Sequence, residues 1–348
     1  MMRLTQDHHQ CRNRHSSWQY RHMASHPTIE IGIVHYPGAQ LAAIHGLSDL
    51  FEVANRFVAQ HQSEGSAFLR VSQWHARTRG KAPVRDNEKG ESADRSPAVI
   101  LLPPSLGGQI SHDDAAPFVD WLVEHHRAGT TLGSMCGGAF LLAETGLLNG
   151  RTATTHWAHA DIFRTRFPDV RLDVDRLIID DGDIICAGGL MAWIDLGLKL
   201  VDRFLGPTIM VETARFLLVD PPGREQRYYS AFSPNLIHGD AAVLKTQHWL
   251  QATGAKEIAL ASLASCAGLE ERTFLRRFRK ATGMTAIDYC QQLRVGKARE
   301  MLQFTTSSIE TVAWDVGYRD VGAFRKIFSR VTGLTPGEFR RRFTVNHG

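Results

Sequence analysis

The chain has 348 residues, of which 43% are hydrophobic and 22% are charged. That length exceeds what a single hydrophobic core usually organises, so two domains are expected. No apolar run approaches the roughly 18 residues of a membrane-spanning helix, so no membrane segment is expected. The formal charge of +4 is unevenly placed, because residues 256–342 hold 16 Lys/Arg against 9 Asp/Glu and concentrate positive charge in the C-terminal third.

The N-terminal residues 1–27 are polar and lack the apolar core of a secretory signal peptide, so we predict a disordered tail. The chain has five scattered cysteines, Cys11, Cys136, Cys186, Cys266 and Cys290. An odd number at irregular spacing indicates no disulfide framework and is typical of a reducing compartment. We therefore expect a cytoplasmic protein.

Short apolar runs alternate with helical periodicities from residue 28 onward. We predict strands at residues 29–35, 67–74, 98–102, 130–135, 151–155 and 177–186, with a hairpin turn at Asp181-Gly182. We predict helices at residues 44–53, 116–126, 138–145, 189–205 and 209–219, and a solvated loop at residues 77–97. This alternation predicts an α/β domain over residues 28–219, with a flavodoxin-like, mostly parallel sheet sandwiched by helices.

Proline and glycine interrupt the helical period over residues 220–239, which we predict to be a linker. The remaining segment, residues 240–343, shows helical periodicity with short glycine turns, so an all-α domain is expected there. The chain thus divides into a tail, an α/β domain, a linker and a helical domain.

Two segments of the helical domain repeat each other at a spacing of 49 to 50 residues. Each copy places a small residue four positions before a glycine, Gly268 in the first copy and Gly317 in the second. Each then places phenylalanine at positions i and i+4, which anchors one face of a helix and leaves the other face free. This pattern is typical of a helix-turn-helix unit, so the domain is predicted to contain two of them.

The second helix of the first copy is strongly basic. Its five cations are Arg272, Arg276, Arg277, Arg279 and Lys280. Arg272 and Arg276 lie one helical turn apart and can each bind a guanine edge, whereas Arg277, Arg279 and Lys280 can meet phosphates. Double-stranded DNA is therefore the expected partner.

Residues 240–343 resemble the AraC-type DNA-binding domain, in which a long helix, here residues 286–302, joins the two helix-turn-helix units. The resemblance places Arg272, Leu275 and Arg276 where the first recognition helix meets bases. In the second recognition helix the corresponding face carries Val321, Gly322, Ala323 and Lys326. Because that face is mostly small and apolar, the second unit is expected to contact phosphates through Arg325 and Lys326 and to read few bases.

Residues 28–219 resemble the PfpI-like branch of the class I glutamine amidotransferase superfamily. The resemblance rests on the stretches at residues 135–157 and 186–206, and a PfpI-like domain joined to an AraC-type domain resembles the GlxA family of transcriptional regulators. In the enzymes of this superfamily a cysteine occupies a sharp strand-to-helix turn, the nucleophile elbow, and a histidine and an acid complete the site. Cys136 and His156 match the first two positions, but Ala43 stands where the acid is expected.

Three roles remain open for Cys136: a nucleophile, a residue of a small-ligand pocket, or a structural thiol. A thiol without a well-oriented base is a poor catalyst, so no catalytic residue is predicted. We expect an exposed thiol beside open backbone N–H groups of Gly137 and Gly138, with His156 completing a ligand pocket. His156 and His159 lack an apparent third ligand, so neither a metal nor a cofactor is predicted.

These features predict a ligand-responsive, sequence-specific DNA-binding regulator that binds successive major grooves of a promoter. The family resemblance implies a nitrogenous or amino-acid-like effector, a homodimer, and RNA polymerase as a further partner. The alternative is a cysteine-dependent amidase or deglycase with an appended DNA-binding domain.

Overall fold

The computed structural model describes residues 27–61, 67–76, 82–86, 96–256 and 258–344. The predicted tail and most of the predicted loop at residues 77–97 lie outside these described residues. The chain divides into two compact units, and the boundary falls between Gln226 and Arg227, inside the predicted linker.

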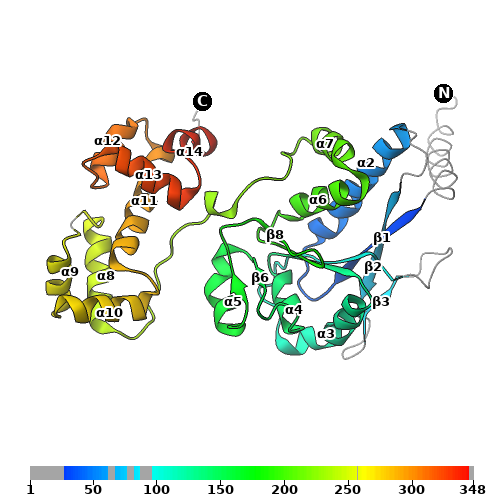
Figure 1. Ribbon diagram of the computed structural model, residues 1–348, viewed down its shortest axis with the longest axis horizontal. Helices are drawn as coiled ribbons and strands as arrows, with labels where there is room; N and C mark the ends of the chain where they lie inside the picture. The colour runs from blue at the N-terminus through cyan, green and yellow to red at the C-terminus, as the bar shows by residue number, and fades with distance from the viewer. Residues whose placement is uncertain (1–26, 62–66, 77–81, 87–95, 257, 345–348) are drawn as a thin grey trace, which may run out of the picture. The chain divides into compact units, whose positions relative to one another are not determined.

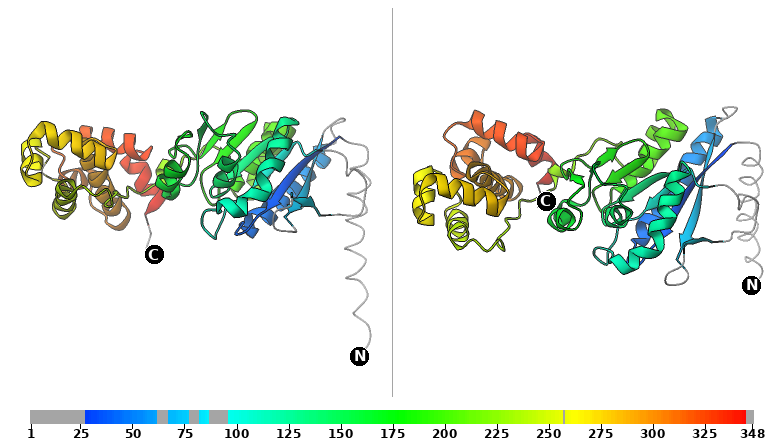
Figure 2. Two further views of the ribbon diagram at one scale, coloured as in Figure 1. Left: turned by 90° about the horizontal axis from the view of Figure 1, so that it is seen from below. Right: turned by 60° about the horizontal axis from the view of Figure 1, so that its bottom comes forward.

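Within the described residues, unit 1 contains a seven-stranded sheet in the order β3-β2-β1-β4-β5-β9-β8 (Figures 1 and 2). Its strands are β1 (Thr28–His35), β2 (Phe68–His75), β3 (Val84–Arg85), β4 (Val99–Leu102), β5 (Thr131–Met135), β8 (Ile178–Asp180) and β9 (Ile184–Ala187). The five central strands run parallel, and β3 and β8 pair antiparallel at the two edges. The short apolar runs of the sequence form the central strands because both faces of these strands are buried.

Helices cover both faces of this sheet and form two hydrophobic cores. On one face lie α2 (Leu41–His61), α6 (Trp193–Leu205) and α7 (Pro207–Phe216). On the other face lie α3 (His112–Arg127) and α4 (Gly138–Glu144). The predicted α/β class, a mostly parallel sheet sandwiched by helices, is confirmed.

The segment after α4 differs from its prediction. Instead of a strand of the main sheet at residues 151–155, β6 (Thr152–Ala153) pairs with β7 (Arg171–Leu172) in a separate two-stranded sheet. The short helices η1 (Trp157–His159) and α5 (Ala160–Arg166) follow β6 and were not predicted. They are too short for a helical period, and α5 is held by tertiary packing, since its Phe163 ring lies 5.0 Å from that of Phe140.

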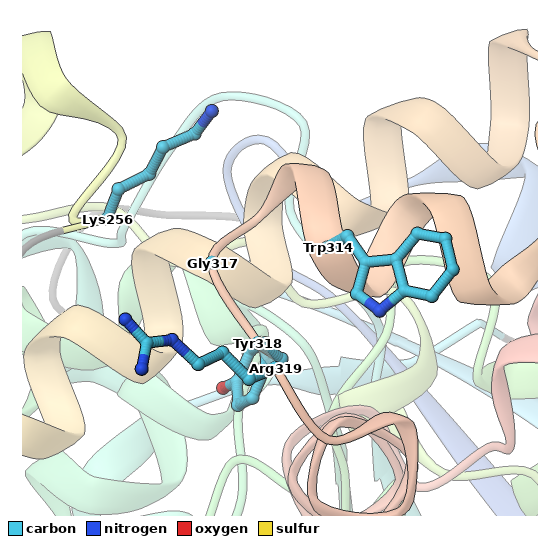
Figure 3. Close-up of a pocket in the computed structure, with 5 residues that line it drawn as sticks. All are labelled: Lys256, Trp314, Gly317, Tyr318 and Arg319. Atoms are coloured by element: carbon cyan, nitrogen blue, oxygen red, sulfur yellow. The ribbon is translucent and has the colours of Figure 1, made fainter.

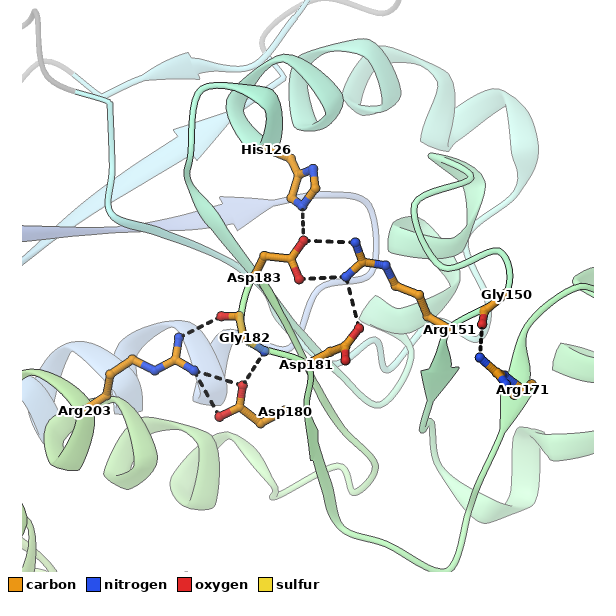
Figure 4. A network of polar contacts seen from close by, with 9 residues as sticks. All are labelled: His126, Gly150, Arg151, Arg171, Asp180, Asp181, Gly182, Asp183 and Arg203. Atoms are coloured by element: carbon orange, nitrogen blue, oxygen red, sulfur yellow. Dashed lines mark hydrogen bonds and ion pairs between the residues drawn. The ribbon is translucent and has the colours of Figure 1, made fainter.

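The predicted hairpin turn at Asp181-Gly182 is confirmed between β8 and β9, where Gly182 adopts a φ of +91°. A network of ion pairs holds this turn (Figure 4). Arg151 donates to both carboxylate oxygens of Asp183 at 2.6 and 3.0 Å, and Arg203 of α6 donates to both oxygens of Asp180 at 2.9 and 3.0 Å. The carbonyl of Ala187 in β9 in turn accepts the N–H of Cys136 at 2.7 Å, so the hairpin supports the backbone at that cysteine.

Unit 2 is helical. Its elements are α8 (Ala241–Thr253), α9 (Leu260–Ala267), α10 (Glu271–Thr282), α11 (Ala286–Phe304), α12 (Ile309–Asp315), α13 (Val321–Thr332) and α14 (Pro336–Phe343). The predicted repeat is confirmed, because α9–α10 and α12–α13 form two similar helix pairs around the left-handed residues Gly268 and Gly317. The four anchoring phenylalanines, Phe274, Phe278, Phe324 and Phe328, are fully buried. None of the helices in the described residues is both long enough and apolar enough to cross a membrane.

Candidate functional site

The turn at residues 135–138, hereafter the elbow, joins β5 to α4 as a nucleophile elbow does. Cys136 has a φ of +49°, a left-handed conformation that is uncommon for a residue with a side chain. The next two residues must be glycine. A Cβ on Gly137 would lie 2.9 Å from the Cβ of Ser105, and one on Gly138 would lie 2.3 Å from the carbonyl oxygen of Leu102.

The thiol of Cys136 is buried, with only 2% of the residue exposed, so the predicted exposed thiol is wrong. Burial raises the pKa of Cys136 to about 11, and the hydrogen bond from the backbone of Gly137 only partly offsets this effect. At neutral pH the group is therefore a neutral thiol, the form that does not act as a nucleophile. The structure retains the backbone geometry of the elbow without an activated sulfur.

The predicted histidine lies on the segment that follows β6. Thr155 donates its hydroxyl to the carbonyl of Cys136 at 2.7 Å, which places the residue before His156 directly against the elbow. The Nδ1 atom of His156 accepts the N–H of Ala158 at 3.1 Å, so the neutral ring carries its proton on Nε2. Burial, assisted by the neighbouring His159, lowers the pKa of His156. His156 thus presents a hydrogen-bond donor rather than a base.

The position expected for an acid holds Ala43, which has no carboxylate and is fully buried in α2. In the described part of the chain, no group of three or more His, Cys, Asp or Glu side chains is placed to hold a metal ion. The elbow therefore has a shaped backbone and a polar donor, but not the set of partners that activates a thiol.

Gln226 is a residue of this region that the sequence did not indicate. Its side chain is 3% exposed, and its amide nitrogen donates to the hydroxyl of Thr154 at 3.1 Å and to the carbonyl of Thr155 at 2.9 Å. Its amide oxygen accepts the N–H of Trp157 at 3.0 Å. The first half of the predicted linker, at Gln226, is thus bound to the same segment, residues 154–157, that contacts the elbow.

A second contact ties the linker to unit 1. Arg224 donates through Nε and Nη2 to the carboxylate of Asp195, at 3.1 and 2.5 Å. The side chain of Asp195 is 2% exposed and lies in the first turn of α6. A buried carboxylate requires such a partner, so this contact holds the linker firmly on unit 1.

In unit 2, α10 divides into two faces. Phe274 and Phe278 are buried, whereas Arg272, Leu275 and Arg276 are exposed on the opposite side. Within the described residues neither Arg272 nor Arg276 forms an ion pair, so both guanidinium groups are available to an acceptor. This arrangement agrees with the face that the sequence predicted for base contacts.

Arg277 has a different position from the one its predicted phosphate contact requires. Its guanidinium binds both carboxylate oxygens of Asp240, the N-cap of α8, at 2.7 and 2.8 Å. This hydrogen bond holds the pKa of Asp240 down at about 2. Arg277 thus joins α10 to α8, while Lys280 is exposed and remains the predicted phosphate contact on this helix.

The exposed face of α13 carries little hydrogen-bonding capacity. Gly322 and Ala323 are exposed at its start, and the side chain of Asp320 caps both of their N–H groups at 2.9 and 3.0 Å. Arg325 pairs with Glu310 at 3.1 Å, whereas Lys326 is exposed. Base contacts by α10 and phosphate contacts by α13 remain predictions that this geometry permits.

Two family models match the chain, one described as a helix-turn-helix domain over residues 263–342 and one as the DJ-1/PfpI family over residues 75–203. The HTH-type transcriptional regulator GlxA of Rhizobium meliloti is 30% identical over 219 residues, which are 62% of this chain and 67% of that protein. The chain belongs to this GlxA-like family. The regulator is also 26% identical to the HTH-type transcriptional regulator CdhR of Pseudomonas aeruginosa over 320 residues, 87% of this chain and 89% of the relative.

Two further comparisons cover a smaller share of the chain. An isonitrile hydratase of Pseudomonas putida is 31% identical over 34% of this chain and 49% of its own length. The crystal structure of Drosophila melanogaster DJ-1beta aligns with 56% of this chain and 99% of that chain, at 19% identity and a TM-score of 0.43. On the two family models and the curated regulators, the chain combines a DJ-1/PfpI domain with an AraC-type helix-turn-helix domain, and it is a DNA-binding transcriptional regulator.

Proposed function

We propose that the regulator responds to a small effector that binds at the elbow, against Cys136, Gly137, Gly138 and His156. The observation that carries this proposal is the retention of a strained elbow backbone around a thiol that burial keeps neutral. A strained conformation persists where the surrounding structure is built around it, most often at a ligand site. The family analogy favours a nitrogenous or amino-acid-like effector, bound in the cytoplasm by a homodimer.

The proposed output is sequence-specific binding to promoter DNA, followed by contact with RNA polymerase. In this proposal α10 enters one major groove and reads bases through Arg272, Leu275 and Arg276, while Lys280 contacts phosphate. Helix α13 enters the next groove and contributes Lys326 to the phosphates. The exposed, unpaired cations of α10 and the small residues of α13 support this division of labour.

The linker is the proposed route between the effector and the DNA. Gln226 binds residues 154–157, which also contact the elbow, so an effector that shifts this segment changes the hydrogen bonds of Gln226. The next residues bind unit 2: Arg299 of α11 donates to the carbonyls of Arg227 and Tyr228 at 3.2 and 2.6 Å. An effector that favours one set of these contacts over another would thereby alter DNA binding.

Thermal unfolding of the full-length regulator in the presence of nitrogenous metabolites, including amino acids, tests the proposal. A true effector at about 100 times its Kd stabilises the protein by about 2.7 kcal/mol and raises the midpoint. The Cys136→Ala and His156→Ala variants should lose that shift, whereas Cys266→Ala, on the other unit, should keep it. A hit whose shift survives both elbow variants would place the effector elsewhere.

The alternative function is a cysteine-dependent hydrolase or hydratase, which the likeness to the isonitrile hydratase favours. Isonitrile, amide and glycated-amine substrates are the appropriate probes for turnover. Loss of turnover in Cys136→Ser, with effector-dependent DNA binding unchanged, would establish the enzyme and overturn the sensor. Absence of turnover in the wild type, with a response that depends on Cys136, is the result we expect.

A further inference from the structure

Unit 2 contains two hydrophobic cores rather than one. The first surrounds Phe274 and Phe278 of α10, and the second surrounds Phe324 and Phe328 of α13. Helix α11 belongs to both: its residues up to Cys290 lie in the first core, and its residues from Val295 onward lie in the second. The residues between them therefore lie at the junction of the two helix-turn-helix units.

Arg294 occupies this junction and is 5% exposed. Its Nε donates to the carbonyl of Ala255 at 2.8 Å, and its Nη2 donates to the carbonyl of Lys256 at 2.9 Å. Both carbonyls belong to the turn after α8, where Ala255 is fully buried in the first core with a φ of +51°. Arg294 is thus bound to the first helix-turn-helix unit by two hydrogen bonds in the fork geometry of a guanidinium.

The same guanidinium contacts the second helix-turn-helix unit. Its Cζ lies 5.1 Å from the centre of the Tyr318 ring, over the face of that ring. Tyr318 belongs to the turn between α12 and α13, and its ring lies 5.5 Å from Phe324, an anchor of α13. A Cβ on Gly317 would lie 3.2 Å from Nη2 of Arg294, so the glycine at this turn also makes room for the guanidinium.

These two turns do not fill the space between them. A pocket of about 420 Å³ is lined by Lys256 from the first turn and by Gly317, Tyr318 and Arg319 from the second, with Trp314 at its side (Figure 3). Arg294 contacts both turns beside this open space. The guanidinium, hereafter the clamp, therefore bridges two turns that also line this pocket.

We propose that Arg294 is a positioning residue that fixes the separation of the two recognition helices, α10 and α13, and thereby the spacing of the DNA sites that the regulator accepts. This proposal rests on the proposed DNA contacts of both helices. Two rigidly held helices tolerate one spacing, because a change of one base pair shifts one site by about 3.4 Å and rotates it by about 34°. Besides the clamp, α11 itself and the contacts of Arg330 on α13 with Gln291 and Asp288 of α11 relate the two helix-turn-helix units.

The test uses the full-length regulator and DNA duplexes that the wild type selects from a randomised library. A second set of duplexes has one base pair inserted or removed between the site of α10 and the site of α13. The wild type should lose about tenfold or more in affinity on either change, as for the loss of a well-formed base contact. Arg294→Lys keeps the charge but loses the fork geometry and the planar stacking of the guanidinium. The affinity that this variant loses when one base pair is inserted or removed should therefore fall to about threefold or less.

Two further variants keep the test decisive. Tyr318→Leu removes the ring face while leaving Arg294 on the first turn, and it should relax the spacing preference even where Arg294→Lys is poorly folded. Lys297→Arg, at an exposed cation of α11 that pairs with Glu300 of the same helix, is the control and should keep wild-type discrimination. Duplexes that hold only the α10 half-site should bind the wild type and the clamp variants equally.

A folded clamp variant that retains the wild-type spacing preference would overturn the proposal. Equal weakening on every duplex, including the half-site, would also overturn it, since that result indicates a general loss of stability. Failure of the α13 half to contribute affinity in the wild type would instead refute the underlying proposal of two DNA-binding helices.

Discussion

Cys136 combines two features that are usually found apart. Its left-handed backbone costs of order 1–3 kcal/mol, which proteins normally retain for function. Its thiol is nevertheless buried and protonated at neutral pH, because desolvation raises its pKa to about 11. At this residue the fold preserves the backbone of the elbow, and the burial of the sulfur disfavours the thiolate, the form that reacts as a nucleophile.

We predict that iodoacetamide alkylates the half-buried Cys266 at neutral pH well before Cys136. Alkylation of Cys136 should accelerate as the pH rises from 9 toward 11, since its thiolate forms only in that range. The raised pKa also means that the thiol stabilises the fold below pH 9 and that this contribution is lost as the pH approaches 11. Peptide mass spectrometry measures both rates, and rapid labelling of Cys136 at neutral pH would contradict the assignment.

We predict that Arg276→Ala weakens binding to a selected duplex by about 1–3 kcal/mol and relaxes preference at one base pair. The reason is that its exposed guanidinium lies on the face of α10 opposite Phe274 and Phe278. Arg215→Ala, an exposed arginine of unit 1, is the control and should bind normally. Fluorescence anisotropy with single-base variants measures both quantities, and unchanged binding by Arg276→Ala would show that α10 reads DNA through other residues.

At the scale of elements, the two recognition helices share an anchor and differ in their exposed faces. Both bury a pair of phenylalanines, which fixes how each helix lies in its unit. Helix α10 then exposes arginine and leucine, whereas α13 exposes glycine and alanine at its start. The repeated phenylalanine pairs give both helices the same seat in the domain. Because their exposed side chains differ, the two helices can form different contacts with DNA.

The hairpin of β8 and β9 supports the elbow through the hydrogen bond from Cys136 to Ala187, and Arg151 ties this hairpin to the segment between α4 and β6. We predict that Arg151→Met lowers the free energy of unfolding by about 1 kcal/mol, a modest value because solvent screens these half-exposed charges. Urea unfolding measures the loss. Arg164→Met, which removes an exposed pair with Asp161, should change stability by less than about 0.5 kcal/mol.

The same substitution has a predictable pH dependence. Arg151 lowers the pKa of Asp183 below its ordinary value of 3.8, so the ion pair contributes its full stability above that pH. The contribution is lost as the pH falls from 3.8 toward the lowered pKa of the folded state. The difference between wild type and Arg151→Met should therefore be constant near neutrality and shrink in acid, and a difference that grows in acid would contradict this origin.

At the scale of the whole molecule, the linker is a bound element along part of its length. Arg224 and Gln226 are held by unit 1, and the carbonyls of Arg227 and Tyr228 are held by Arg299 of unit 2. Adjacent residues thus belong to different units, and the peptide bond between Gln226 and Arg227 joins them. A change in the hydrogen bonds of Gln226 therefore occurs one residue before Arg227, the first residue of the DNA-binding unit.

We predict that Gln226→Ala destabilises unit 1 by about 1–3 kcal/mol, because it leaves buried backbone groups without their partner. It should also abolish the effect of an effector on DNA affinity while leaving affinity in the absence of effector within about threefold of wild type. Anisotropy titrations with and without the effector measure the coupling. Gln73→Ala, which removes the contact of Gln73 in β2 with His35 in β1, should retain the coupling. A normal effector response in Gln226→Ala would exclude the linker as the route.

The sequence by itself determined the α/β class, the doubled helix-turn-helix and the basic face of α10, because these depend on local periodicity and on residue types at fixed spacing. Only the tertiary structure decided the burial of Cys136, the ion pair that engages Arg277, and the contacts of Gln226 and Arg294. Each of those joins residues that are distant in the chain, such as Asp240 with Arg277 and Ala255 with Arg294. The energy of a long-range contact depends on which surfaces meet and how much water they exclude, and local sequence patterns carry no record of either.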